Sequence, residues 1–496
     1  MQEEYATLAA LDLGSNSFHL QVGRVEGEQL FYLDSHKDSV RLAAGLGADK
    51  QLDDAAQARA LKCLARFGER LKGMPPGAVR AVGTSALRQA KNAAAFIEQA
   101  RAALGFDIDI VAGREEARLI YLGVSHSLPL SSETRLVVDI GGGSTECIVG
   151  TGHEPRERES LRMGCVVYGD RFFAGGRIDK AAMKAAVTAA RVEAQAVAQT
   201  FRRERWQEAV GSSGTARSMG EVLLQNGLSD GQITADGLKW LREQIGRAGH
   251  LARLDLPGLK TDRQPVIAGG VAIMSGLFRE FGIETMTVAQ GAMREGILWD
   301  LLGRVHDHDI RDVTVRQFVR RYHIDGKQAR RVERLALRLY AQMNAADEIN
   351  AELARRLTWA ARLHEIGISI AHSGLHKHGA YILENADMPG FSRRDQAQLA
   401  RLVRASRGGM DKLGLPAHDL AWPLILCLRL AVLFNLSRAE GPVPAIHLEN
   451  HDGECRLVLP LGWAQVNPLT QAALADELRA WRALAPETRL VEVVEV

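Results

Sequence analysis

Two copies of one short motif constrain the fold of this chain more than any other feature of its sequence. "ALDLGSNSFHL" occupies residues 10–20 and "VVDIGGGSTEC" occupies residues 137–147. Asp12 corresponds to Asp139, 127 residues later, and the same offset relates the glycines and serines that follow. A repeat of this kind indicates two copies of one folding unit. We therefore expect two related lobes that face each other across a cleft, each with a turn rich in Gly, Ser and Asn that points into it.

Strand-like and helix-like segments alternate through the first 303 residues, which is typical of an α/β fold. We expect strands at "LAALDL", "VRAVGT", "RLVVDI", "WQEAVGSSG", "PVIAGG" and "ETMTVAQ", and helices over residues 53–72 and 86–104 and over "GAMREGILWDLLG". Residues 311–440 have a helical pattern without convincing strands, and they carry 21 Lys and Arg against 13 Asp and Glu. The residues after 441 combine strand-like runs with one helix.

The length of the chain and these changes of pattern predict four domains, since one domain usually takes roughly 100–200 residues. We expect a first lobe over residues 1–124, a second lobe over 125–303, a basic helical domain over 304–440 and a small α+β domain over 441–496.

Composition narrows the class of protein. Hydrophobic residues make up 46% and charged residues 25%, as in an ordinary globular protein, and a net charge of +2 argues against bulk binding of polyanions by the whole chain. The five cysteines are widely spaced without a CxxC motif, so we expect reduced thiols and neither a zinc site nor disulfides. No signal peptide is evident, and the most apolar stretch, "AWPLILCLRLAVLFNL", is interrupted by Arg429 and reads as a buried helix. We expect a cytoplasmic protein, at most peripheral to the membrane.

The repeated motif has the composition of a phosphate-binding loop beside a metal site. Glycines let backbone N–H groups approach phosphate oxygens, and hydroxyl groups add donors. Carboxylates repel phosphate, so acids beside such loops make sense as ligands of a hard divalent cation, Mg2+. The candidate phosphate ligands are Gly14, Ser15, Asn16, Ser17, Gly141, Gly142, Gly143, Ser144 and Thr145, and the candidate metal ligands are Asp12, Asp139 and Glu146. Tight β-hairpins with solvated acids are the alternative, and the matched pair of loops favours the phosphate interpretation.

These motifs also carry a resemblance to a known family. "ALDLGSNSFHL", "VGTSALRQA", "GREEARLIYLGV", "DIGGGSTE", "RMGCVVYGDRFF", "GSSGTA" and "VIAGG" follow one another through residues 6–303. In them the sequence resembles the exopolyphosphatase and guanosine pentaphosphate phosphohydrolase (Ppx/GppA) family, within the superfamily of acetate kinase, sugar kinases, Hsp70 and actin. It most resembles the long bacterial exopolyphosphatases. The resemblance implies a duplicated α/β fold of the actin-like ATPase type, followed by an all-α HD-like domain and a small α+β C-terminal domain.

The resemblance implies catalytic residues as well. Glu116 in "GREEARL" matches the family's proposed catalytic glutamate, and Arg88 after "GTS" matches a phosphate ligand. From the residues alone, Glu116 reads as an ordinary acid in the first turn of a helix, and Arg88 as an exposed helix arginine. "GSSGTA", with Gly214, reads either as a further phosphate loop or as a plain turn from strand to helix.

The helical domain carries an altered version of another motif. "RLHEIG" resembles the signature of HD phosphohydrolases with Glu365 in place of Asp, and the later helix "LRLAVLFN" has no acid to complete a metal site. We therefore expect an electrostatic role, a channel for a long polyanion. A solvated helix face is the alternative for each basic stripe. The candidate channel residues are His376, His378, Arg393, Arg394, Arg404 and Arg407.

Together these features favour an exopolyphosphatase that removes terminal phosphate processively from inorganic polyphosphate, with Mg2+ and with Glu116 activating the attacking water. Hydrolysis of guanosine pentaphosphate (pppGpp) at its 5′ end is the alternative within the same chemistry, and a polyphosphate or alarmone sensor without hydrolysis is a further alternative. A kinase of the same superfold is disfavoured, because "VIAGG" offers little for an adenine. A monovalent cation, K+ or NH4+, and a homodimer fit the family. Nucleic acid is not an expected partner, because aromatic residues are only 5% of the chain, and neither is a membrane.

Overall fold

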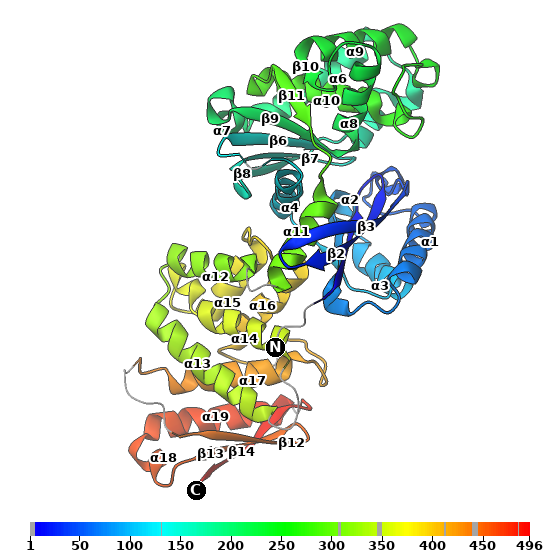
Figure 1. Cartoon of the computed structure of the whole chain (residues 1–496). Helices are drawn as coiled ribbons and strands as arrows, with labels where there is room; N and C mark the ends of the chain where they lie inside the picture. The colour runs from blue at the N-terminus through cyan, green and yellow to red at the C-terminus, as the bar shows by residue number, and fades with distance from the viewer. Residues whose placement is uncertain are drawn as a thin grey trace. The chain divides into compact units, whose positions relative to one another are not determined.

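The computed structural model describes residues 5–129, 131–305, 309–344, 350–410, 413–438, 445–484 and 486–496. The chain forms two compact units, Met1–Ile310 and Arg311–Val496 (Figure 1). The finer division into four domains remains a prediction.

The first sheet of the N-terminal unit has five strands in the order β3-β2-β1-β4-β5. The first three strands form an antiparallel meander, and β4 and β5 then add in parallel beside β1. The strands are β1 (Thr7–Leu13), β2 (Phe18–Glu26), β3 (Gln29–Asp38), β4 (Val79–Gly83) and β5 (Ile108–Ile110). Helices α1 (Asp54–Leu71) and α3 (Ala93–Leu104) pack together and bury their apolar faces in one core with this sheet.

The second sheet repeats this plan in the order β10-β11-β9-β6-β7-β8. A meander of three strands is again followed by strands that add in parallel, β9 beside β6 and β11 beside β9. The duplication predicted from the two motifs is therefore present in the topology. The strands are β6 (Thr134–Ile140), β7 (Thr145–Thr151), β8 (Glu154–Leu161), β9 (Glu208–Ser212), β10 (Ile233–Thr234) and β11 (Thr285–Val288).

The duplication extends to the register of the two leading hairpins. Asp12 of β1 lies opposite His19 of β2, and Asp139 of β6 lies opposite Glu146 of β7. His19 therefore occupies in the first copy the position that Glu146 occupies in the second.

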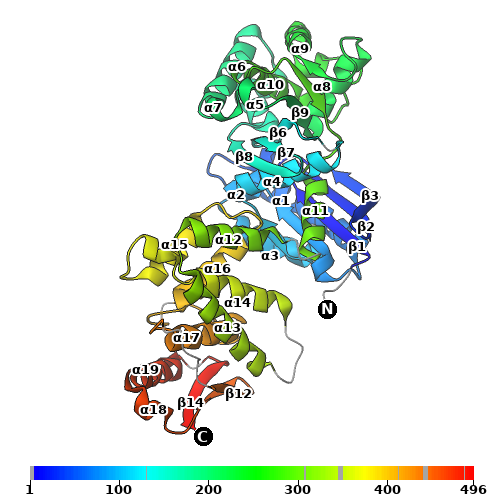
Figure 2. The same cartoon turned by 60° about the vertical axis from the view of Figure 1, so that its left-hand side comes forward.

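Helices α4 (Gly113–His126) and α11 (Met293–Val305) lie side by side in both views (Figures 1 and 2). Their backbones approach closely at Gly123 and Gly296, and a Cβ placed on Gly296 would overlap the carbonyl oxygen of Leu119. Only a residue without a side chain allows this approach. The crossing fixes α4, the helix that carries the predicted catalytic glutamate.

Two elements of this unit differ from expectation. "PVIAGG" forms no strand, because a 3-10 turn with Pro265 leads into α10 (Ile267–Phe281). This helix is buried around nearly its whole circumference, so its sequence shows no helical period. The helix expected over 86–104 is two helices, α2 (Ser85–Gln89) and α3, with a break at residues 90–92. The remaining helices are α5 (Cys165–Phe172), α6 (Lys180–Gln195), α7 (Ala198–Phe201), α8 (Ser213–Gln225) and α9 (Ala235–Ala248).

The C-terminal unit is a helical core with a small sheet. Its helices are α12 (Ile310–Arg321), α13 (Gly326–Met343), α14 (Ala351–Leu363), α15 (Leu375–Asn385), α16 (Arg393–Ala405), α17 (Ala421–Phe434), α18 (Trp463–Val466) and α19 (Pro468–Leu484). The sheet has the order β12-β13-β14, with strands β12 (His447–His451), β13 (Glu454–Leu459) and β14 (Arg489–Glu495).

The most apolar stretch of the sequence forms α17, a buried helix as expected. Arg429 in its middle is balanced by Glu477 of α19, whose carboxylate accepts two hydrogen bonds from the guanidinium at 2.5 and 2.7 Å. A paired charge can remain buried where an unpaired one could not. Across the described ranges, no helix combines the length and the apolar character that a membrane span requires.

We predict that Gly296→Ala lowers the free energy of unfolding by about 1–3 kcal/mol, because the added methyl group displaces the backbone of α4 from α11. Gly246→Ala is the matched control. Gly246 lies within α9 with no atom within 4 Å of its Cβ position, so alanine there should stabilise the protein by about 0.5–1 kcal/mol. Urea unfolding of both variants checks the prediction, and equal effects would contradict the close crossing.

Candidate functional site

A small cavity of about 110 Å³ lies where two loops and the first turn of α8 meet in the N-terminal unit. The loops span residues 14–17 and 141–144 and follow strands β1 and β6, and α8 begins at Ser213 directly after β9. Because β6 and β9 are parallel neighbours, the segments that follow them leave the same edge of the sheet. The predicted phosphate ligands of the two loops and Gly214 of α8 all line the cavity.

The two repeated loops touch each other inside this cavity. A Cβ on Gly142 would lie 3.1 Å from the Cβ of Ser15, and a Cβ on Gly143 would lie 3.1 Å from Ser15 Oγ. Side chains at these glycines would push the loops apart. The Ser17 hydroxyl is buried, and within the described ranges it has no hydrogen-bond partner. Buried polar groups normally have one, so the loop is suited to a bound anion.

Four carboxylates reach the same cavity. Asp12 stands near the end of β1, Glu116 in the first turn of α4, Asp139 in β6 and Glu146 in β7. Glu116 is 7% exposed, Asp139 6% and Glu146 1%, whereas Asp12 is partly exposed. Ser160 Oγ donates a hydrogen bond to Glu146 at 2.7 Å. The sequence predicted all four as site residues, and the fold brings all four together.

Burial raises the pKa of each of these acids, and repulsion by a neighbouring carboxylate adds to the shift for Asp12, Glu116 and Glu146. Burial, then Glu116, raises the pKa of Asp12 to about 8, although Arg294 opposes the shift. Burial raises the pKa of Asp139 to about 6, against a hydrogen bond from Ser212. Burial also raises the pKa of Glu116, and burial together with the Glu116 charge raises that of Glu146 well above its usual value. Ionising all four together is therefore costly unless a cation enters the cavity.

The donor set suits Mg2+ bound partly through water. Carboxylate oxygens are the ligands that Mg2+ prefers, and Asp139 and Glu146 lie opposite each other on adjacent strands. Within the part of the chain that the structure describes, no three acidic, His or Cys side chains converge closely enough to hold a metal ion by themselves. Mg2+ usually takes only one or two carboxylates and completes its shell with waters and substrate phosphates, so this geometry does not conflict with a magnesium site.

Arg88 has a different neighbour from the one expected. It was predicted to grip phosphate, but its Nη1 atom donates to Glu116 Oε2 at 3.0 Å and to the carbonyl oxygen of Val111 at 2.9 Å. It does not line the cavity. Through this hydrogen bond, Arg88 orients Glu116. Its charge also lowers the pKa of Glu116, against the larger effect of burial.

The acid next to Glu116 has a structural role. Arg118 binds Glu115 through two hydrogen bonds of 2.8 Å, and it also pairs with Asp300 of α11. Asp300 in turn pairs with Arg80 of β4. This buried network ties α4 to α11 and β4, so the first of the two glutamates anchors the helix and the second faces the cavity.

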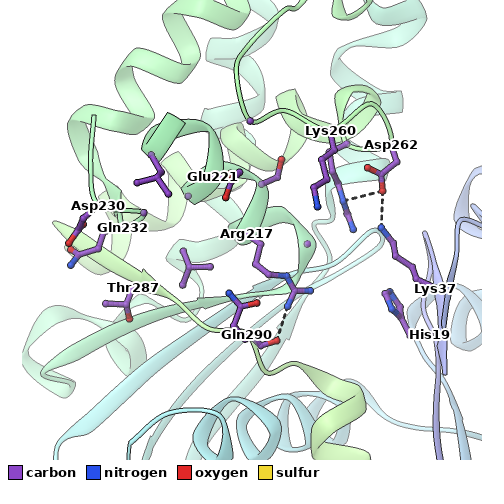
Figure 3. A pocket seen from close by; sticks show the side chains of 18 residues that line it. His19, Lys37, Arg217, Glu221, Asp230, Gln232, Lys260, Asp262, Thr287 and Gln290 are labelled. Carbon is purple, nitrogen blue, oxygen red and sulfur yellow. Dashed lines mark hydrogen bonds and ion pairs between the residues drawn. The ribbon is translucent and has the colours of Figure 1, made fainter. Parts of the chain in front are cut away.

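A larger pocket of about 720 Å³ adjoins the cavity and shares His19, Gly214, Arg217 and Arg263 with it. Figure 3 shows His19 and Lys37 entering from β2 and β3, while the other labelled side chains come from residues 217–290. Four of its lining residues are cationic, Lys37, Arg217, Lys260 and Arg263, and three are acidic, Glu221, Asp230 and Asp262. Lys37 Nζ donates to Asp262 at 2.8 Å.

Sequence reasoning missed most of this pocket. Its residues range from His19 to Gln290 and belong to no single motif. His19 could have been found, because the repeat offset aligns it with Glu146. Burial, then the charges of Arg294 and Lys37, lowers the pKa of His19 to about 3, so its imidazole is neutral in the ordinary working range.

Other predicted residues lie elsewhere. Thr145 departs from expectation, because its fully buried hydroxyl donates to the carbonyl oxygen of Met163 at 2.6 Å and it does not line the cavity. The candidate channel residues all lie in the C-terminal unit. His376 has the charges of Arg407 and Arg404 near it, whereas Arg394 lines a separate pocket. A channel along these residues stays a prediction.

Comparison with known proteins gives a consistent result. A model described as the Ppx/GppA phosphatase family matches residues 22–305, and a model described as Ppx/GppA phosphatase, domain III, matches residues 310–478. A protein of Aeromonas hydrophila, named guanosine-5′-triphosphate,3′-diphosphate pyrophosphatase, is 38% identical over 490 residues, which is 98% of each chain.

Two solved structures share the fold. An exopolyphosphatase from Cytophaga hutchinsonii is 24% identical with a TM-score of 0.55, over 60% of this chain and 98% of its own. The Aquifex aeolicus PPX-GPPA enzyme is 23% identical with a TM-score of 0.50, over 59% of this chain and 98% of its own. The predicted actin-like α/β fold, with a helical region and a small C-terminal sheet, is confirmed.

We predict that Asp12→Asn stabilises the protein and that the gain grows between pH 4 and pH 8. The pKa of Asp12 is about 8 in the folded protein against a usual value of 3.8, so the folded state holds this proton more tightly. Its contribution to the free energy of unfolding is therefore full below pH 4 and is lost as the pH rises to 8. Asparagine does not ionise, so the variant avoids this loss. The gain should reach a few kcal/mol at pH 8, because each pKa unit corresponds to about 1.4 kcal/mol and water in the cavity offsets part of it.

Urea unfolding at pH 5 and pH 8, in the presence of a chelator, measures this difference. Asp255→Asn, at an exposed position outside the cavity, is the control and should show no such trend. An Asp12→Asn variant destabilised equally at both pH values would contradict the electrostatic account.

Proposed function

Because the chain belongs to the Ppx/GppA phosphatase family, we propose that it hydrolyses guanosine pentaphosphate, removing the terminal phosphate of the 5′-triphosphate. The relative that aligns over 98% of the chain is named for this substrate. This proposal reverses the preference drawn from the sequence, which placed inorganic polyphosphate first and pppGpp second.

One observation carries the proposal: the carboxylate cavity opens beside a pocket about the size of a nucleotide. The cavity of about 110 Å³ has room for the reacting phosphate, and the pocket of about 720 Å³ falls within the range of ligand sites, roughly 300–1,000 Å³. Guanosine pentaphosphate has phosphates at both ends of its ribose. A substrate with its 5′ end in the cavity would place its nucleoside and 3′-diphosphate among the cations of the pocket. Inorganic polyphosphate has no base or ribose to occupy this space.

The reaction needs a base for water and a means to offset the charge of the phosphates. Glu116 is the base in this proposal, because it faces the cavity and its raised pKa brings it nearer to neutral pH. Arg88 holds its carboxylate in place at 3.0 Å. The two loops bind the phosphates through backbone N–H groups and serine hydroxyls. Water attacks the terminal phosphorus, the bond to the bridging oxygen breaks, and Glu116 accepts the proton.

Mg2+ belongs to this proposal as the ion that lets the acids and the phosphates share one cavity. Asp139 and Glu146 would hold it, with Asp12 nearby, and it would screen the phosphate charge when bound. A monovalent cation and a homodimer, both expected from the resemblance, remain predictions.

We predict that Glu116→Gln lowers phosphate release from pppGpp by about 10²–10⁴-fold while leaving substrate binding nearly intact, since the amide cannot accept the proton. Phosphate release by the full chain with Mg2+ is the measurement, and polyphosphate and ATP serve as competing substrates. Glu98→Gln is the control, because Glu98 is an exposed glutamate of α3. Wild-type activity in Glu116→Gln would remove Glu116 from the mechanism. Faster hydrolysis of polyphosphate than of pppGpp by the wild type would overturn the choice of substrate.

We predict further that Lys260→Gln raises the KM for pppGpp about tenfold with kcat changed less than about twofold, since one charged hydrogen bond is worth about 1.5–3 kcal/mol. Lys260 lines the pocket, and no described residue pairs with it. The affinity for GTP, which lacks the 3′-diphosphate, should change little. Lys239→Gln, on the exposed face of α9, is the matched control. Equal losses for pppGpp and GTP would show that Lys260 does not contact the 3′-diphosphate.

A further inference from the structure

A second pocket lies wholly within the C-terminal unit and has no residue in common with the site described above. Its volume is about 500 Å³, within the range of small-ligand sites. It lies between α14, α16 and the start of α17, and the preceding segment from Pro416 completes its wall.

Three arginines converge on this pocket. Arg394, Gln398 and Arg401 recur at spacings of four and three along α16, so they share one face of that helix. Arg356 joins them from α14, which packs against α16.

Two carboxylates, those of Glu352 and Asp419, line the pocket together with the arginines. The Arg356 guanidinium is half-buried, and no described residue accepts a hydrogen bond from it or pairs with it. Burial lowers the pKa of Arg356, whereas the charges of Glu352 and Asp395 oppose this shift and that of Arg394 adds to it. Glu352 is already engaged by Arg311, at 2.8 and 3.3 Å. Asp419 lies 3.9 Å from Arg401, at the outer limit of an ion pair.

The pocket also contains an acceptor without a donor. Gln398 Oε1 is buried, and no described group donates a hydrogen bond to it. Since buried oxygens of this kind are normally satisfied, a ligand with an O–H or N–H group beside its negative charge would complement the wall.

We propose that this pocket binds a small phosphorylated ligand of nucleotide class, separately from the catalytic cavity. Guanidinium groups present paired N–H donors that match phosphate oxygens, so Arg356 and Arg401 hold the phosphates. Gln398 accepts a hydrogen bond from a hydroxyl group of the sugar. An anion at this position offsets the cost of a half-buried arginine that has no partner among the described residues.

The test reads the pocket directly in the full-length protein. Phenylglyoxal modifies accessible arginines, and mass spectrometry gives the modification rate at each one. At a tenfold excess of GDP over its Kd, the pocket is about 90% occupied, so modification of Arg356 and Arg401 should slow about tenfold. Arg330, on the exposed face of α13, is the internal control and should react at an unchanged rate. Pyrophosphate, which has no sugar hydroxyl, should protect less than GDP.

A matched pair of variants completes the design. In Arg356→Gln, GDP should no longer protect Arg401, whereas Arg330→Gln should keep the protection, and thermal melting checks that both variants are folded. If sulfate at equal ionic strength slowed the modification of Arg356 and Arg401 as much as GDP does, general charge screening would explain the effect. That result would overturn the proposal. Protection by long polyphosphate but not by GDP would also overturn it, in favour of a polymer surface. Neither outcome depends on whether the catalytic cavity hydrolyses pppGpp.

Discussion

Four carboxylates share one small cavity, and ionising all four together costs free energy. The groups around the cavity are arranged to offset this cost. Each carboxylate has a raised pKa, and burial is the largest cause in every case. Arg88 and Arg294 offset part of this cost from the cavity wall or just behind it. A bound cation would offset the rest, and the acids and the proposed phosphate-binding loops could then occupy the same site. A ligand with many phosphates and a divalent ion would neutralise each other there.

Such a site works only if its acids are held at fixed positions. For Glu116 the fixing depends on contacts outside the cavity. The crossing of α4 and α11 at Gly123 and Gly296 fixes the position of α4 against α11. The buried network of Glu115, Arg118 and Asp300 then fixes the rotation of α4 about its own axis. A helix held by close backbone contact and by paired buried charges has few ways to shift. Of the two adjacent glutamates, Glu115 therefore anchors the helix, and Glu116 is the one proposed as the base.

The sequence predicted the features that are repeated along the chain and the helices and strands with a clear hydrophobic period. It did not predict features that have neither a repeat nor a period. The two loops and the aspartates before them, Asp12 and Asp139, were found because the duplication repeats them at a constant offset, whereas Glu116 was found through the family resemblance. The strand expected at "PVIAGG" is a helix, because α10 is buried nearly all round and has no polar face to reveal its period. The pairing of Arg88 with Glu116 joins residues that are distant in sequence, and no spacing rule predicts it. The larger pocket draws residues from His19 to Gln290, so only the folded chain brings them together.

The two copies of the motif have diverged in a way that gives the site two differently charged sides. In the second copy, Asp139 faces Glu146, and the pair of acids suits a cation. In the first copy, Asp12 faces His19, which burial and nearby cations keep neutral. A glutamate in place of His19 would add a fifth carboxylate to the cavity and place it beside Arg217 and Arg263, where it would compete with phosphate for these cations. A neutral imidazole avoids both effects. In the proposed mechanism, the duplicated hairpin would thus provide a metal-binding side in one copy and leave the other open to an anionic substrate.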